Sequence, residues 1–443
     1  MKKIISNLLF GSLILSCFAL EACDKGEIAV TGTYSAFLQG NDWGENISRI
    51  TLELDKSVDR NTVSAEDFLV RETKEVFDWQ QADKGLFEKT TERKVTNVYI
   101  SDKEGNESDQ SSEYLTLEFS TGPNDGRYYL LSPDSPSSQY PKIYKLDISL
   151  SEKSDLTSNG KKVSSLKVNP NINQLNHSAK QFTLDSFKAS DGVKYEYAQF
   201  TPQGESETLV VWLHGLLEGG ATNTDPYITI LGNEAANLGK EDFQKEMGGA
   251  HILAPQSPSF WMDKSGKDQL IDGKINSDGT SYYTKSLHEL IQSYKEKVGA
   301  KTVIIAGCSN GGYMGMILAR EYGKEYDGYM LICEAMENRF VTDEDIQKLK
   351  NLPLYFIYST KDPLVIPEEN EIPTIERLKA AGATNLQVAV FDEVLDTSAT
   401  IQTENGKPYD FGGHSVWVPF FNNEVVSQDG VSAWDWIAEL VKK

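Results

Sequence analysis

The segment Ala306-Gly307-Cys308-Ser309-Asn310-Gly311-Gly312 decides the fold of this chain, because it joins an apolar run to a helical pattern through a sharp turn. The apolar run 301–306 predicts a buried strand, and residues 313–322 predict a helix. Glycines on both sides of the serine let the backbone reverse without a clash of a Cβ atom. The segment therefore predicts a nucleophile elbow, with the hydroxyl of Ser309 raised above a sheet.

Two later segments offer an acid and a base for this serine. The apolar run 352–358 leads into Asp362, and Gly412-Gly413-His414 lies on a glycine-loosened loop before the last predicted helix. Ser309, Asp362 and His414 therefore follow one another in the order nucleophile, acid, base, which is one of the known chain orders of a catalytic triad. Asp392, at the end of the run 388–391, is an alternative acid.

An upstream loop is predicted to complete the site. The buried strand 209–213 runs into His214-Gly215-Leu216-Leu217-Glu218-Gly219-Gly220. We expect the backbone N–H groups of Leu216 and Asn310 to form an oxyanion hole, because a strand-to-helix loop and the residue after the nucleophile commonly supply these donors. His214 is expected to brace this loop rather than to take part in chemistry.

The first residues predict export. Lys2 and Lys3 precede the nearly apolar stretch 4–20, which has the layout of a secretory signal and is short for a membrane span. Leu20-Glu21-Ala22-Cys23 is similar to a bacterial lipobox, so Cys23 is predicted to carry a lipid anchor, with Cys17 as a second candidate. The alternative is an ordinary cleaved signal. The prediction is therefore an envelope lipoprotein, in the outer membrane or periplasm, or a secreted protein.

The composition limits the kinds of partner and cofactor that the protein could bind. The 443 residues include 43 basic and 66 acidic side chains, a net charge of −23, which argues against a nucleic acid as partner. Beyond the export segment only Cys308 and Cys333 remain, so no disulfide framework is predicted, although a bridge between these two stays open. No His/Cys spacing suggests a metal site, and no cofactor is expected.

The hydropathy pattern divides the chain into two domains. Short alternating runs such as 47–54, 114–119 and 144–150 predict an antiparallel β-sandwich over residues 24–175, after an export segment at 1–23. The stretch 58–70 resembles a turn that is common in bacterial immunoglobulin-like modules, which implies an immunoglobulin-like sandwich. From residue 176 to 443 buried strands alternate with helices, which predicts a mostly parallel sheet covered on both faces. Bond chemistry is expected only from the second domain, while the first could roof a cleft. Trp43 is expected in the core or on the surface.

The second half resembles the α/β-hydrolase superfamily, and more narrowly bacterial esterases and predicted peptidases that carry an immunoglobulin-like domain before the hydrolase domain. The resemblance rests on the two loops above, the Ser309 elbow, Pro255-Gln256-Ser257-Pro258 with Trp261, and His414-Ser415-Val416-Trp417. It implies that Trp261 and Trp417 line the substrate pocket. Two departures are Leu217, where the family more often has glycine, and a polar insertion at 393–411 that is expected to shape the cleft rim.

The combined prediction is a serine hydrolase that cleaves a small-molecule or glycan-linked carboxylic ester through an acyl-enzyme intermediate. A serine peptidase of the prolyl oligopeptidase type is one alternative, because a triad serves amides as well as esters. A surface-binding lipoprotein without catalytic activity is the other. The residues specify neither the oligomeric state nor the natural ester.

Overall fold

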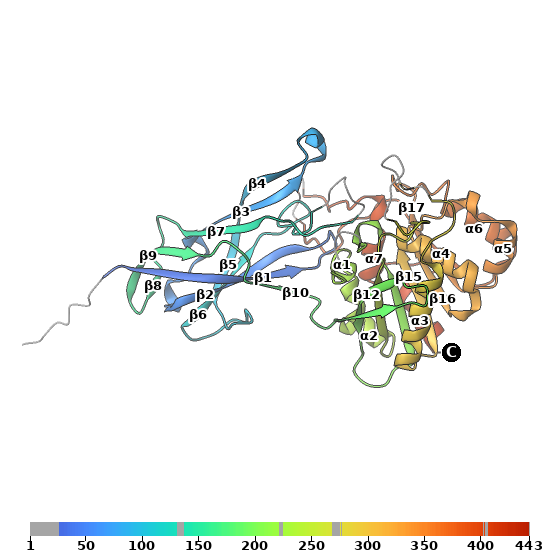
Figure 1. Ribbon diagram of the computed structural model, residues 1–443, viewed down its shortest axis with the longest axis horizontal. Coiled ribbons are helices and arrows are strands. Elements are labelled where there is room, and N and C mark those ends of the chain that lie inside the picture. The colour runs from blue at the N-terminus through green and yellow to red at the C-terminus, as the bar shows by residue number, and fades with distance from the viewer. Residues whose placement is uncertain are drawn as a thin grey trace, which may run out of the picture.

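The computed structural model describes residues 26–130, 137–220, 225–267, 275, 277–401, 403 and 406–442. Figure 1 shows two bodies side by side along the long axis, a β-sandwich built from the first part of the chain and an α/β body that ends at the C-terminus. The predicted export segment, with Cys17 and Cys23, lies outside the described residues. Within the described ranges, no helix combines the length and apolar character that a membrane crossing requires.

The first body is a sandwich of two sheets. In the described part of the chain one sheet has the order β5-β6-β2-β1-β9-β8, with β10 also paired to β1, and the other has the order β4-β3-β7. The strands are β1 (Ile28–Gln39), β2 (Asn46–Val58), β3 (Phe68–Phe77), β4 (Leu86–Arg93), β5 (Val95–Ile100), β6 (Ser112–Phe119), β7 (Tyr144–Leu150), β8 (Thr157–Ser158), β9 (Lys161–Val168) and β10 (Gln174–His177).

Alternating side chains hold the two sheets together. Ile50, Leu52 and Leu54 of β2 are buried, while the residues between them face outward or lie at the boundary. This period of two is the pattern from which the sandwich was predicted, and the immunoglobulin-like architecture is confirmed. One feature was not predicted: β1 pairs in parallel with β9 and β10, so the larger sheet is mixed rather than purely antiparallel.

The second body is built on one large sheet, with the order β11-β12-β14-β13-β15-β16-β17-β18 among the described residues. β12 is antiparallel to both of its neighbours, and the later pairs are parallel. The strands are β11 (Thr183–Lys188), β12 (Lys194–Phe200), β13 (Thr208–Leu213), β14 (His251–Gln256), β15 (Thr302–Cys308), β16 (Gly328–Ile332), β17 (Leu354–Ser359) and β18 (Leu386–Phe391).

Helices cover both faces of this sheet, as predicted (Figure 1). β13, β14, β16 and β17 are buried along their whole length, which explains why their sequences are continuous apolar runs. The helices are α1 (Ile228–Leu231), α2 (Glu241–Glu246), α3 (Thr284–Val298), α4 (Asn310–Tyr322), α5 (Asp343–Leu349), α6 (Glu371–Ala380), α7 (Trp417–Phe421) and α8 (Ala433–Val441).

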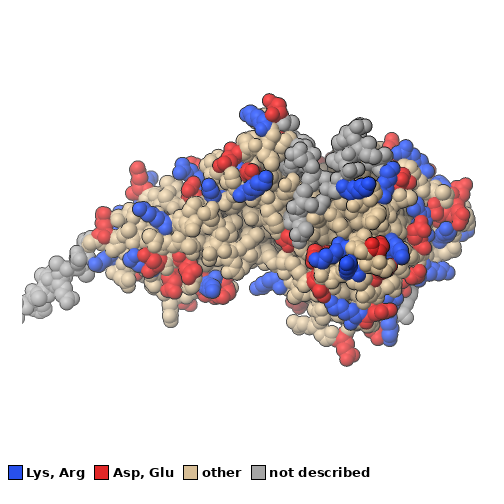
Figure 2. Space-filling model, in the orientation of Figure 1, with Lys and Arg blue, Asp and Glu red and all other residues tan. Residues whose placement is uncertain are grey.

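The two bodies are joined by more than a linker. The change of sheet falls between the end of β10 and the start of β11, a few residues after the predicted boundary at 175/176, because β10 still pairs with β1. One continuous apolar core includes Leu38 and Ile47 of the sandwich together with Trp212 and Phe420 of the α/β body. Acidic and basic side chains are interspersed over the visible face of both bodies (Figure 2). The junction is therefore a packed apolar interface beneath a mixed-charge surface.

This shared core predicts that the second domain depends on the first for stability. A chain that begins at residue 176 would expose the junction and lose the partner of β10. We expect its melting temperature in scanning calorimetry to be at least about 5 °C below that of the chain from residue 26, because 1 kcal/mol shifts the melting temperature of a domain this large by about 2–4 °C. Equal melting temperatures would show that the two bodies fold independently.

Candidate active site

Ser309 occupies a strained turn between β15 and α4. Its φ of 53° and ψ of −114° are angles that residues other than glycine rarely adopt. The close packing around it requires glycine, since a Cβ on Gly311 would lie 1.9 Å from the carbonyl oxygen of Leu213, and one on Gly307 would lie 2.6 Å from that of Gly311. The glycines therefore allow α4 to start directly after the serine, at Asn310.

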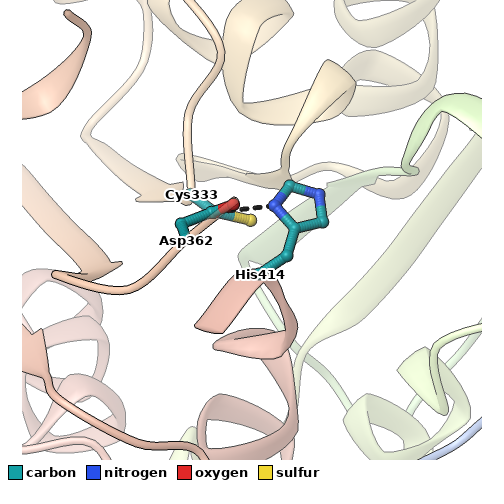
Figure 3. A group of neighbouring side chains, drawn as sticks. All are labelled: Cys333, Asp362 and His414. Atoms are coloured by element: carbon teal, nitrogen blue, oxygen red, sulfur yellow. Dashed lines mark hydrogen bonds and ion pairs between the residues drawn. The ribbon is translucent and has the colours of Figure 1, made fainter. Parts of the chain in front are cut away.

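The structure brings Ser309, Asp362 and His414 together. His414 Nε2 lies 3.1 Å from Ser309 Oγ, and His414 Nδ1 lies 2.7 Å from Asp362 Oδ2. Figure 3 shows the carboxylate of Asp362 pointing at the imidazole of His414. The side chain of Asp362 is 2% exposed and that of His414 is 17% exposed. This arrangement can move a proton from the serine hydroxyl to the imidazole while the carboxylate holds the ring.

Backbone contacts fix the acid and the base. Asp362 Oδ1 accepts hydrogen bonds from the N–H groups of Leu364 (2.8 Å) and Val365 (3.0 Å), which leaves Oδ2 to face the imidazole. The loop of His414 approaches the loop of Asp362 so closely that a Cβ on Gly413 would lie 2.5 Å from the Lys361 carbonyl. The glycine before the histidine is thus a condition for the short contact between acid and base.

The alternative acid, Asp392, lies elsewhere. Its Oδ1 accepts a hydrogen bond from the hydroxyl of Thr360 at 2.9 Å, and its side chain is exposed after the end of β18. Among the described acidic residues it is Asp362 that reaches His414. The geometry therefore favours Asp362 as the acid of the group.

The predicted oxyanion donors lie beside the serine. Asn310 is the first residue of α4, so its N–H has no acceptor within the helix. Leu216 begins a short 3₁₀ turn, Leu216–Glu218, that follows β13. Asn310 and Leu216 both line the same cavity as Ser309. Leu217, the departure from the family pattern, lines this cavity too, with 42% of its surface exposed. The roles of the two N–H groups stay predictions that this placement allows.

His214 braces the loop that carries Leu216. Its Nδ1 donates to the carbonyl of Gly215 at 2.6 Å, and its Nε2 accepts the N–H of Ser257 at 2.9 Å. Burial lowers the pKa of His214 to about 4, so the ring is neutral and keeps one tautomer. The N–H of Gly215 is bound by the carboxyl of Glu218 at 2.8 Å, and burial raises the pKa of that carboxyl to about 8.

The two tryptophans expected in the pocket have different positions. Trp417 lines the cavity, with its ring edge-on to His414 at a centroid distance of 5.3 Å. Trp261 is fully buried in the core and is absent from the described residues that line the cavity. Its backbone N–H instead donates to Asn310 Oδ1 at 2.6 Å. The prediction that Trp261 lines the pocket is therefore corrected: its backbone holds the side chain of Asn310, the residue after Ser309.

The cavity above Ser309 has a volume of about 780 Å³ and is lined by both domains. The insertion at 393–411 contributes Tyr409 and Phe411 near its C-terminal end. The sandwich contributes Trp43, Arg127 and other polar residues, which sequence analysis did not assign to the site. These residues come from turns between strands, and no local pattern shows which distant segment such a turn will face.

A third group, Cys333, lies next to the acid and the base. The Sγ of Cys333 and the side-chain atoms of Asp362 and His414 lie within 4.8 Å of one another, close enough to share a metal ion (Figure 3). Burial raises the pKa of the Cys333 thiol well above its usual value, however, and a neutral thiol is a poor ligand. The other two groups already hydrogen-bond each other. Cys308 and Cys333 are both free and buried rather than bridged.

Two buried carboxyl groups lie near Asp362. Glu334 and Glu371 are both inaccessible to solvent. Burial raises the pKa of Glu334 to about 8, and burial followed by repulsion from Glu334 raises the pKa of Glu371 well above its usual value. Neither carboxyl therefore adds a negative charge near the triad at neutral pH.

Comparison with known proteins agrees with this architecture. Residues 33–191 match the family model of the esterase Ig-like N-terminal domain. The crystal structure of a thermostable esterase is similar over 93% of this chain and 99% of its own, with a TM-score of 0.65 and 19% sequence identity. The chain has an α/β-hydrolase fold, and its first body is similar to the immunoglobulin-like N-terminal domain of esterases. At this identity the structural match establishes the shared two-domain fold.

Two further solved structures match only about half of the chain. A ferulic acid esterase has 14% identity over 48% of this chain and 90% of its own, with a TM-score of 0.36. The Pyrococcus furiosus esterase Pf2001 has 18% identity over 48% of this chain and 82% of its own, with a TM-score of 0.35. No curated protein sequence matches the chain significantly.

The geometry predicts unequal effects of two similar substitutions on ester hydrolysis. Asp362→Asn should lower kcat by about 10³–10⁴-fold, because an amide would hold the imidazole in the wrong tautomer. Asp392→Asn, the matched control on the neighbouring strand, should change kcat by less than about twofold. Steady-state kinetics of both variants on a nitrophenyl ester would reveal the ranking, and the reverse ranking would give the role to Asp392.

Proposed function

We propose that this protein is a serine hydrolase that cleaves carboxylic esters through an acyl-enzyme intermediate. The hydrogen-bonded series from Ser309 through His414 to Asp362 carries the proposal, because it couples a nucleophile, a general base and an orienting carboxylate. The cavity above the serine has space for a substrate of several hundred cubic ångströms.

The reaction would proceed in two steps. In the first, Ser309 Oγ attacks the ester carbonyl while His414 Nε2 takes the hydroxyl proton and passes it to the leaving alkoxide. In the second, water attacks the acyl-serine, and the same imidazole removes a proton from water and returns it to Ser309. The N–H groups of Asn310 and Leu216 would stabilise the oxyanion in both steps, each contributing about 3 kcal/mol in comparable sites.

Support for an ester over an amide comes from the first domain, which matches the N-terminal domain family of esterases. A triad alone does not discriminate, so a serine peptidase is the alternative enzyme. Hydrolysis of nitrophenyl acetate without hydrolysis of aminoacyl nitroanilides would separate the two enzymes. Glycan binding without hydrolysis of either substrate would favour the surface-binding alternative.

Removal of the nucleophile tests the proposal directly. Ser309→Ala should reduce kcat/KM for nitrophenyl acetate by at least about 10³-fold, because acyl transfer to the enzyme becomes impossible. Ser190→Ala, at an exposed serine outside the site, should retain wild-type activity. Circular dichroism and melting curves would verify the fold of both variants. Activity of folded Ser309→Ala within about tenfold of wild type would refute the mechanism.

We also propose that the enzyme works outside the cytoplasm as a lipoprotein anchored through Cys23. The apolar stretch 4–20 followed by Leu20-Glu21-Ala22-Cys23 supports this location.

The anchor predicts a change of compartment. Full-length protein should fractionate with membranes, and Cys23→Ser should release it, because the acylated thiol is lost. Cys17→Ser serves as the control and should leave the protein in the membrane fraction. Soluble wild-type protein with a mature N-terminus other than Cys23 would point to an ordinary signal peptidase.

A further inference from the structure

The cavity above Ser309 has two chemically different sides. The α/β body lines it mainly with apolar side chains, including Leu216, Met262, Val365 and Trp417. The sandwich lines it mainly with polar and charged groups from three connections between strands: Asp42 and Glu45 after β1, Asn124 and Arg127 after β6, and Ser138 before β7. A substrate that fills the cavity would therefore meet an apolar wall on one side and hydrogen-bonding groups on the other.

The polar wall is held in a fixed position relative to the serine. The N–H of Ser138 donates to the carbonyl of Leu217 at 2.6 Å, which ties the sandwich to the loop of the predicted oxyanion hole. Asn422, directly after α7, donates to the carboxylate of Asp42 at 3.1 Å. Glu234 of the α/β body also hydrogen-bonds Asp42, and burial followed by this hydrogen bond raises the pKa of Glu234 to about 8. These contacts make the first domain part of the site rather than a loosely attached neighbour.

The charges on this wall favour a neutral polar group. The side chain of Arg127 is 39% exposed, and its guanidinium lies 3.7 Å from the buried carboxyl of Glu45. Asp42 places a second carboxyl on the same wall. A carboxylate on the substrate would meet the two acidic side chains, and an ammonium group would meet the arginine. Hydroxyl groups, which both donate and accept hydrogen bonds, can pair with Arg127, Asn124 and Asp42 alike.

We propose that the first domain binds the alcohol part of the substrate, and that this part is a neutral, hydroxyl-rich group such as a sugar. The acyl part then lies against the apolar wall of the α/β body. The hydroxyl-rich group is assigned to the alcohol side because one of its own hydroxyls forms the ester. Hydrolysis of such an acylated sugar consumes water and yields the free sugar and a carboxylic acid. This proposal rests on the proposed esterase function.

The test compares substrates that share one acyl group. Full-length enzyme is assayed on the butanoate ester of methyl glucoside and on nitrophenyl butanoate. Arg127→Gln and Asn124→Ala should each lower kcat/KM for the glucoside ester by at least about tenfold, the effect of losing a good hydrogen bond. The same variants should lower kcat/KM for nitrophenyl butanoate much less, because its leaving group lacks the hydroxyls that these side chains would bind.

Two controls keep the outcome interpretable. Arg71→Gln removes an exposed arginine of β3 outside the cavity lining and should affect neither substrate. Asn124→Ala is the second control, because Asn124 is exposed and its substitution leaves the core intact. Its effect can therefore be interpreted even if Arg127→Gln loosens the turn around Glu45. Equal losses on both substrates, or no loss on the glucoside ester, would overturn the proposal. A wild-type enzyme inactive on both nitrophenyl acetate and nitrophenyl butanoate would instead refute the esterase function itself.

Charged analogues test the neutrality of the site. Butanoate esters of methyl glucuronoside and methyl glucosaminide add an anionic or a cationic group to the same ring. We expect kcat/KM for both to fall at least about fivefold below that for the neutral glucoside. A preference for the anionic ester that disappears in Arg127→Gln would show that Arg127 is an anion site and would overturn the assignment of a neutral group.

Discussion

The active site depends on the contact between Gly311 and the carbonyl oxygen of Leu213, where a side chain of any size would collide. This contact lets the first turn of α4 lie against the end of β13. It places the end of β13, which leads to the predicted oxyanion loop, beside the turn that carries Ser309. The strained angles of the serine persist because the packing on both sides leaves no alternative. The loops that carry Asp362 and His414 then meet this turn at the same edge of the parallel sheet.

Sequence patterns predicted those parts of the structure that depend on local rules. Alternating apolar residues indicated the sandwich, and continuous apolar runs indicated β13, β15 and β17. The glycines at 307 and 311 indicated the sharp turn at Ser309, and the order of the segments along the chain suggested that Asp362 and His414 would join it. The structure places the three side chains within hydrogen-bonding distance of one another in series. These features are encoded within a few residues of the positions that they determine.

The features that sequence did not reveal are contacts between distant segments. Trp261 was assigned to the pocket because it follows a family motif, yet it packs in the core behind Asn310. Trp43 and Arg127 face the cavity, although their turns resemble any polar connection in a sandwich. The parallel partners of β1 are residues 161–168 and 174–177, more than a hundred positions away. Such pairings follow from the global packing of apolar surface rather than from a local signal.

The direction of β1 would set how far the cavity lies from a membrane if Cys23 carries a lipid. Figure 1 shows that β1 begins at the end of the sandwich remote from the α/β body and runs toward the junction. Its 12 residues span about 40 Å at the usual rise of an extended strand. With a lipid at Cys23, only a few residues before this strand, the sandwich would act as a rigid stalk. The cavity would then stand roughly 40 Å from the bilayer, beyond the headgroup layer and within reach of polymers that never touch the membrane.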